Sequence, residues 1–106
     1  MSPDESILRN APDPVATARF STGQLVATPT ALSMLVSLKV SPWSLLDRHI
    51  RGDWGDLDEH DCRENERALL AGDRLLSAYS LPDGTRLWII TEADRSATTL
   101  LLPADY

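Results

Sequence analysis

Cysteine, positive charge and long apolar runs are scarce in this sequence, and each shortage excludes a class of protein. The 106 residues include one cysteine, Cys62, so no disulfide can form within the chain, and a single thiol suits the reducing cytoplasm. The longest apolar run, residues 31–38, contains serines and is far shorter than the roughly 20 residues of a membrane-spanning helix. The first ten residues carry acids and lack an apolar segment, so we expect no secretory signal. The sequence therefore predicts a cytoplasmic chain without membrane contact.

Negative charge exceeds positive charge over the whole chain. Ten basic residues, of which only Lys39 is a lysine, stand against sixteen acidic residues and give a formal net charge of −6. This balance argues against direct binding to the phosphate backbone of nucleic acids. Residues 47–67 hold eight acidic residues and four arginines, which account for −4 of the −6. Because arginine pairs well with carboxylates, we interpret this segment as a solvated surface of neighbouring ion pairs.

The common catalytic and metal-binding motifs are absent. There is no glycine-rich phosphate loop, no HExxH, no CxxC and no GxSxG. Cys62 is a poor nucleophile because the neighbouring carboxylates raise the pKa of its thiol. The acidic run superficially has the spacing of a calcium loop, but Trp54 and Leu57 stand where oxygen ligands are required. We therefore expect neither a metal nor a cofactor, although five residues there are potential ligands: Asp53, Asp56, Asp58, His60 and Asp61.

The first two-thirds of the chain predict three helices. Residues 1–20 contain prolines and no periodic pattern, so we expect a loosely ordered arm followed by a single domain over residues 21–106. Thr28-Pro29 and Ser41-Pro42 are typical helix starts, and they predict helices over residues 30–38 and 43–50. The first of these is apolar on most sides, so we expect it at the buried centre of the domain. Asp58 and Gly72 then delimit a third helix.

The last third of the chain changes to the period of strands. RLLSAYSL and TRLWIIT flank Pro82-Asp83-Gly84, which predicts a hairpin with Tyr79 opposite Leu87 and Ala78 opposite Trp88. ATTLLL, residues 97–102, predicts another strand. The fold expected is α+β: a helical layer packed on a three-stranded antiparallel β-meander, or a four-stranded one if residues 24–27 add an edge strand.

Polar residues interrupt apolar faces where the second and third helices meet. His49 shares a helix face with leucines, and Asn65 stands on the third helix where a leucine is expected. The loop Asp53-Trp54-Gly55-Asp56 joins the two helices. Because buried polar groups must be paired, we expect these side chains to converge. The candidate polar cluster consists of His49, Asp53, Trp54, Asp56, Asp61, Asn65 and Arg95.

Two interpretations of this cluster remain open. In the structural one, the aspartates cap backbone N–H groups, Trp54 fills the core and Asn65 bridges the loop. In the functional one, His49, Asp53 and Asn65 anchor a ligand in a shallow pocket whose walls are Trp54 and Trp88. A lone histidine on an apolar helix face is more often a core residue than a catalyst, so we favour a chain that is not an enzyme.

Three stretches of the sequence, RHIRGDWGDL, GDRLLSAYSLPDGTRLWIITEADRS and TTLLLPADY, resemble a family of small uncharacterised proteins encoded on plasmids and integrative elements of proteobacteria. The resemblance covers residues 20–106. Some members carry the label of a type I restriction subunit M, but a methyltransferase needs a cofactor-binding α/β domain larger than this whole chain. The resemblance implies carriage by a mobile genetic element and no particular activity.

Three functions are compatible with these features. The leading hypothesis is a non-catalytic accessory module that binds a protein partner or self-associates across the apolar second face of its sheet. The second is an anti-defence or anti-restriction protein whose acidic residues imitate nucleic acid, although interleaved arginines do not suit a dedicated mimic. The third is a small enzyme or ligand-binding domain that uses His49, Asp53 and Asn65, with Arg95.

Overall fold

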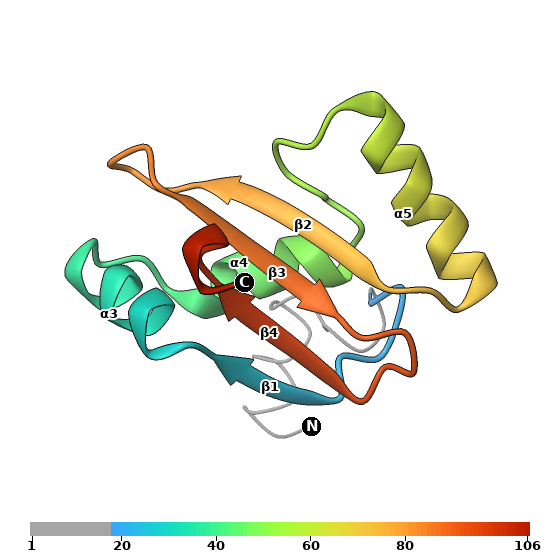
Figure 1. The fold of residues 1–106 in the computed structure, drawn as a ribbon, viewed down its shortest axis with the longest axis horizontal. Helices are drawn as coiled ribbons and strands as arrows, with labels where there is room; N and C mark the ends of the chain where they lie inside the picture. Colours follow the sequence, from blue (N-terminus) through green and yellow to red (C-terminus); the bar gives the residue numbers. More distant parts are fainter. Residues whose placement is uncertain (1–17) are drawn as a thin grey trace, which may run out of the picture.

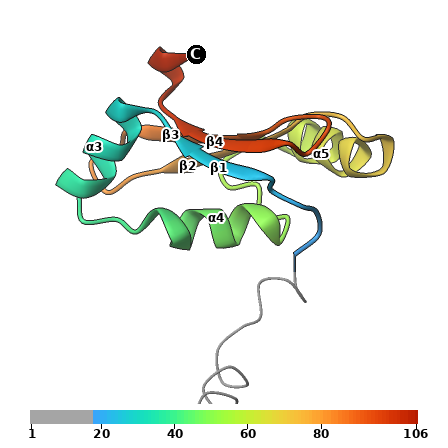
Figure 2. The same cartoon turned by 90° about the horizontal axis from the view of Figure 1, so that it is seen from below.

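A four-stranded sheet lies at the centre of the computed structural model, which describes residues 18–106 (Figure 1). Helix α4 covers one face of the sheet, and α3 and α5 lie at opposite sides of it (Figure 2). The elements in chain order are β1 (Gln24–Ala27), α3 (Pro29–Ser37), α4 (Pro42–Ile50), α5 (Glu59–Ala71), β2 (Leu75–Ser80), β3 (Arg86–Thr91), β4 (Ala97–Leu101) and the 3-10 turn η1 (Pro103–Asp105). Most of the predicted arm, residues 1–17, lies outside the described residues.

The helix ends predicted from capping residues are confirmed. At the start of α3, the Thr28 hydroxyl accepts a hydrogen bond from the N–H of Ala31 at 3.2 Å. At the start of α5, the Asp58 carboxylate accepts one from the N–H of Asp61 at 2.8 Å, and Gly72 ends the helix in the left-handed conformation. Among residues 18–106, no helix combines the length and the apolar character that a membrane crossing requires.

The predicted hairpin is confirmed together with its register, because β2 and β3 pair antiparallel with Tyr79 opposite Leu87 and Ala78 opposite Trp88. Strand β4 pairs antiparallel with β3, as the predicted meander requires. The fourth strand corrects the expectation of an entirely antiparallel sheet, because β1 lies beside β4 and parallel to it. The direction of β1 depends on the path of the chain through three helices, which the local pattern of four residues does not encode. The fold is α+β with a mixed sheet in the order β1-β4-β3-β2.

The larger core lies between α4 and the sheet. In Figure 2, α4 runs below the sheet, so this core fills the lower face. Alternate residues of each strand point to this face, so the buried side chains of Leu87 and Ile89 on β3 meet Leu45 and Leu46 of α4. Burial of this apolar surface supplies the main driving force for the packing of α4 on the sheet.

Helix α3 is less buried than its apolar sequence predicts. Its buried residues are Ala31 and Leu35, whereas Leu32 and Val36 expose 47% and 71% of their surface. The helix lies at one side of the sheet instead of the centre of the domain (Figure 2), so only one stripe of it meets the core. The expectation of a central, buried helix is therefore wrong, and the outward stripe of α3 remains an apolar surface.

A second, smaller core lies between α5 and the β2 side of the sheet, and its buried members are Trp54, Ala68 and Leu75. The ring of Phe20 stacks on that of Trp54 with 6.3 Å between centroids. The backbone N–H of Arg19 donates to the carbonyl of Ile50 at 2.8 Å. The packed domain therefore includes Arg19 and Phe20, which the sequence assigns to the arm.

Candidate functional site

His49 lies at the centre of the predicted polar cluster and is fully buried. Its Nδ1 is 2.6 Å from the hydroxyl of Ser77 on β2, and its Nε2 is 2.9 Å from the hydroxyl of Thr91 on β3. The Thr91 hydroxyl lies 2.7 Å from that of Thr98 on β4, which donates to the backbone carbonyl of Thr22 at 2.8 Å. A continuous chain of hydrogen bonds thus joins α4 to three strands of the sheet.

The imidazole of His49 is neutral at pH 7. Burial lowers its pKa from 6.5 to about 3, because the charged ring loses its hydration there. Both ring nitrogens contact hydroxyl groups, and the rings of Phe20 and Trp54 pack edge-on at 5.2 and 5.8 Å between centroids. With both nitrogens paired and the ring enclosed, His49 has a structural role in the domain.

The pKa of His49 predicts that the domain loses stability in mild acid. The unfolded chain binds a proton on this residue below about pH 6.5, whereas the folded chain does so only near pH 3, so stability falls as pH drops through that window. Between pH 7 and pH 5 we expect a loss of about 2 kcal/mol in the free energy of unfolding. Urea unfolding at the two pH values measures this loss. The variant His49→Gln, whose amide does not titrate, is expected to lose much less, and an equal loss would assign the effect to other groups.

The loop GDWGD lies along the outer edge of β2 and makes backbone hydrogen bonds with it. Gly55 pairs with Ala78 in a single parallel bridge. The N–H of Asp56 donates to the carbonyl of Ala78 at 2.7 Å, and the N–H of Ala78 donates to the carbonyl of Trp54 at 3.2 Å. The Tyr79 hydroxyl donates to the backbone carbonyl of Asp53 at 2.6 Å. Burial raises the pKa of this phenol to about 12. The loop therefore satisfies the backbone groups at the middle of the β2 edge.

Asn65 covers the next pair of backbone groups on the same edge. Its Nδ2 donates to the carbonyl of Leu76 at 2.6 Å, and the N–H of Leu76 donates to its Oδ1 at 3.1 Å. By alternation along the strand, the N–H and C=O groups of Leu76, Ala78 and Ser80 point away from β3. The side chain of Asn65 and the loop together cover this edge at Leu76 and Ala78, and a covered edge is protected against pairing with another chain.

Ion pairs surround the cluster. Arg48 donates from Nε to the Asp53 carboxylate at 2.7 Å, and this guanidinium lowers the pKa of Asp53 below its usual value. Arg19 pairs with Glu66 at 2.7 Å, and the Trp54 indole N–H donates to the same carboxylate at 2.9 Å, so the pKa of Glu66 is lowered as well. Carboxylates with lowered pKa values are weak general bases at neutral pH.

The acidic candidates lie outside this network or at its margin. Asp56 accepts a hydrogen bond from the Ser80 hydroxyl at 2.6 Å, which extends the clamp on β2. Asp61 is exposed on the first turn of α5, and its potential ligand atoms lie within 4.8 Å of those of Asp58 and His60. Such exposed acidic groups are common without a bound ion, so this group gives no independent sign of a metal.

Arg95 and Trp88 complete the candidate set, and neither lines a pocket with His49. Arg95 donates from Nη1 to the backbone carbonyl of Asp73 at 2.6 Å, just after α5. Trp88 lies on the opposite face of the sheet from His49, because strand residues alternate in direction, and its ring packs against Tyr106 at 5.9 Å. His49, the loop and Asn65 therefore form a clamp that joins α4 and α5 to β2, with Arg95 securing the end of α5, whereas Asp61 lies outside this clamp.

The other edge of the sheet is different, because no strand lies beyond β1 in the described residues (Figure 1). The N–H groups of Gln24 and Thr28 donate toward β4 at 2.9 Å each. By alternation, the N–H and C=O groups of Leu25 and Ala27 point away from β4. Four backbone groups of β1 are therefore directed outward, and the strand carries no charge or proline that would discourage pairing.

Exposed apolar side chains gather around this open edge. Seven large hydrophobic residues are exposed in the part of the chain that the structure describes. Two of them, Leu70 and Tyr106, lie away from β1. We call the remaining five the edge patch: Leu25 and Val26 on β1, Leu32 and Val36 on α3, and Trp43 on α4. Trp43 exposes 66% of its surface. Such a concentration of apolar surface around a free strand edge is typical of a binding surface.

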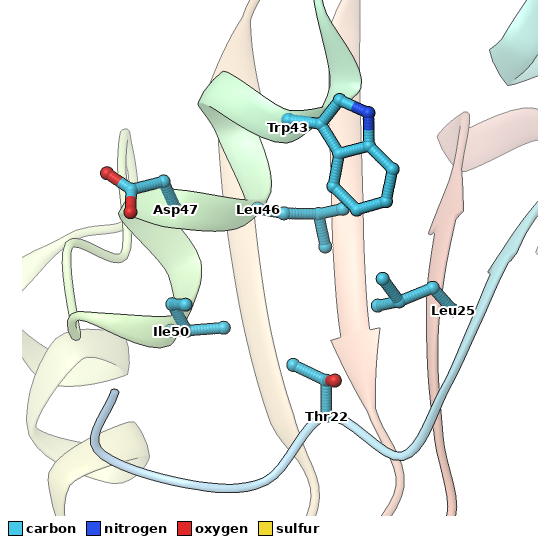
Figure 3. A pocket seen from close by; sticks show the side chains of 6 residues that line it. All are labelled: Thr22, Leu25, Trp43, Leu46, Asp47 and Ile50. Carbon is cyan, nitrogen blue, oxygen red and sulfur yellow. The ribbon is translucent and has the colours of Figure 1, made fainter. Parts of the chain in front are cut away.

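A cavity of about 390 Å³ opens between β1 and α4 beneath the edge patch. Figure 3 shows Trp43, Leu46 and Ile50 of α4 facing Leu25 and Thr22 across it. A second depression of about 180 Å³ continues along β1 toward Leu32. The apolar groove therefore runs parallel to the open backbone edge.

Sequence reasoning did not find this site. The helix over residues 30–38 is apolar on most sides, and that pattern assigned Leu32 and Val36 to the core. One signal was present: Trp43, Leu46 and Ile50 follow one another at intervals of three and four residues, which places them on one side of α4. The open edge itself depends on the order of strands in the sheet, which the sequence pattern does not give.

Comparisons with protein-family models, with curated proteins and with solved structures found no match to this chain. Two features of the structure bear on function: the edge patch and the clamp.

Proposed function

We propose that the chain is a cytoplasmic, non-catalytic accessory module of a mobile genetic element, and that it acts by binding a polypeptide strand along the open edge of β1. The mobile element is proposed from the resemblance of residues 20–106 to plasmid-encoded proteins. The mode of binding is proposed from the contrast between the two edges of the sheet.

That contrast carries the proposal. On β2, the loop and Asn65 pair the outward backbone groups of Leu76 and Ala78. On β1, the corresponding groups of Leu25 and Ala27 face outward beside a groove lined by apolar side chains. An added strand would gain main-chain hydrogen bonds from the edge, and every second side chain would enter the groove. The expected partner segment is therefore extended, with apolar residues at alternate positions.

The other two hypotheses receive less support from the described residues. His49, Asp53 and Asn65 each have structural partners, which favours a clamp over a catalytic group. The three glutamates of α5 form ion pairs with arginines, as between Arg63 and Glu59 at 3.0 Å. Because the arginines neutralise these carboxylates, the surface of α5 is a poor imitation of the negative charge of nucleic acid.

Selection from a library of displayed peptides tests the proposed function. Wild-type chain, immobilised at low density, is expected to enrich peptides with apolar residues at alternate positions. Val26→Asp places a charge on the open edge and is expected to weaken their binding at least about tenfold. Leu70→Asp is the matched control, because Leu70 is 93% exposed on α5 at the other side of the sheet. If no peptide prefers wild type to Val26→Asp, the proposal is wrong.

A further inference from the structure

We infer that the strand bound by β1 is β1 of a second copy of the same chain, so that two sheets join into one continuous sheet of eight strands. This inference rests on the proposed function, since it names the partner of the same edge. Three features of the described residues lead to it: the register of β1, the distribution of charge and the size of the edge patch.

The register of β1 suits antiparallel pairing with itself. The outward backbone groups belong to Leu25 and Ala27, which lie on either side of Val26. A two-fold axis through Val26 places Leu25 of each copy opposite Ala27 of the other, as two hydrogen-bonded pairs. All four outward groups of each strand are then used, and the two Val26 side chains meet at the axis.

The same arrangement places apolar side chains in the groove. Leu25 and Ala27 lie on the face of the sheet that α4 covers, because they pair with Thr98 and Leu100 of β4. In the pair of chains, Leu25 of the second copy lies beside Ala27 on this face, over the depression whose lining includes Trp43. The interface is thus self-complementary, as a two-fold interface requires.

Charge is distributed in a way that favours this pairing. The strand β1 is uncharged, and Asp47, the acidic residue of the groove, turns its carboxylate away from Leu25 (Figure 3) and pairs with Arg51 at 3.0 Å. The acidic helix α5 lies on the opposite side of the sheet (Figure 1). Two copies joined through β1 therefore keep their acidic helices at the far ends, where repulsion between chains of net charge −6 is smallest.

The edge patch supplies apolar surface for a small dimer interface. Its five side chains leave between 40% and 71% of their surface exposed in each copy. Pairing of the two strands adds backbone to this surface, and a specific interface needs about 1,000 Å² or more in total.

The test measures mass in solution by sedimentation or light scattering, over a wide range of concentration, for four chains: wild type, Val26→Asp, Val26→Lys and Leu70→Asp. We expect wild type and Leu70→Asp to form dimers. Each Val26 variant places two like charges at the axis and is expected to associate at least about tenfold more weakly. An equimolar mixture of the two Val26 variants is expected to regain dimers, since opposite charges then meet across the axis. Urea unfolding of each variant is the control that checks whether the fold persists.

Wild-type chains that stay monomeric at every concentration overturn the inference. So does a dimer that both Val26 variants leave intact, because its interface then lies elsewhere. A monomeric chain that still binds the selected peptides through the β1 edge removes the second copy as partner and keeps the proposed function. A monomeric chain that binds no such peptide contradicts both.

Discussion

Replacing His49 by alanine is expected to lower the free energy of unfolding by about 3–5 kcal/mol, which is a large part of the stability of a domain of this size. The substitution removes a fully buried ring that packs against Phe20 and Trp54. It also leaves the Ser77 hydroxyl, 2.6 Å from Nδ1, without its buried partner. The loss combines the cavity with an unpaired polar group.

Urea unfolding measures this loss, and the second histidine provides the control. His60 is exposed on the first turn of α5, so His60→Ala is expected to change the free energy of unfolding by no more than about 0.5 kcal/mol. If His49→Ala costs less than about 1 kcal/mol, the hydrogen-bonded chain is not a structural clamp, and a site at His49 becomes the better interpretation.

Replacing Gly55 by alanine is expected to lower the free energy of unfolding by about 2–4 kcal/mol. Gly55 has a φ of +77°, and a Cβ there would overlap the carbonyl oxygen of Ala78. The loop would have to move off β2, and the hydrogen bonds of Asp56 and Trp54 with Ala78 would be lost. This variant therefore tests the clamp at its closest approach to the sheet.

Gly84 is the control that distinguishes the effect of the close contact at Gly55 from the effect of its left-handed backbone conformation. It has a φ of +88° in the hairpin turn, but a Cβ there would meet no atom within 4 Å. Gly84→Ala is expected to cost about 1–2 kcal/mol for the left-handed conformation alone. Equal losses at the two glycines, measured by urea unfolding, would mean that contact between the loop and β2 adds nothing to stability.

Local signals in the sequence predicted the elements of this fold well. The N-caps Thr28 and Asp58 and the glycine after α5 mark helix ends through contacts within one turn. The turn at residues 82–84 sets the register of the hairpin in the same local way. The parallel direction of β1 and the exposed position of α3 were not predicted, because both depend on contacts between distant parts of the chain.

The candidate site also contains residues that local sequence signals predict and residues that only the folded structure brings together. His49 and Asn65 were recognised because polar residues interrupted apolar helix faces, and both are indeed buried and paired. The hydroxyl partners Ser77, Thr91 and Thr98 were not recognised, since they converge only in the folded sheet. The edge patch was missed for a further reason: apolar residues such as Leu32 look alike in sequence whether they face a core or a partner.

Amide hydrogen exchange at Leu25 and Ala27 tests the central claim most directly, because it reports on the backbone groups that a bound strand would pair. The two amides are expected to exchange freely in the dilute chain and to slow at least about tenfold when a strand is bound, either the second copy or a selected peptide. Leu76 and Ala78, whose amides donate to Asn65 and Trp54, serve as internal controls and are expected to be protected in both states. If binding occurs and leaves the exchange of Leu25 and Ala27 unchanged, the partner does not add a strand to β1, and the account is wrong.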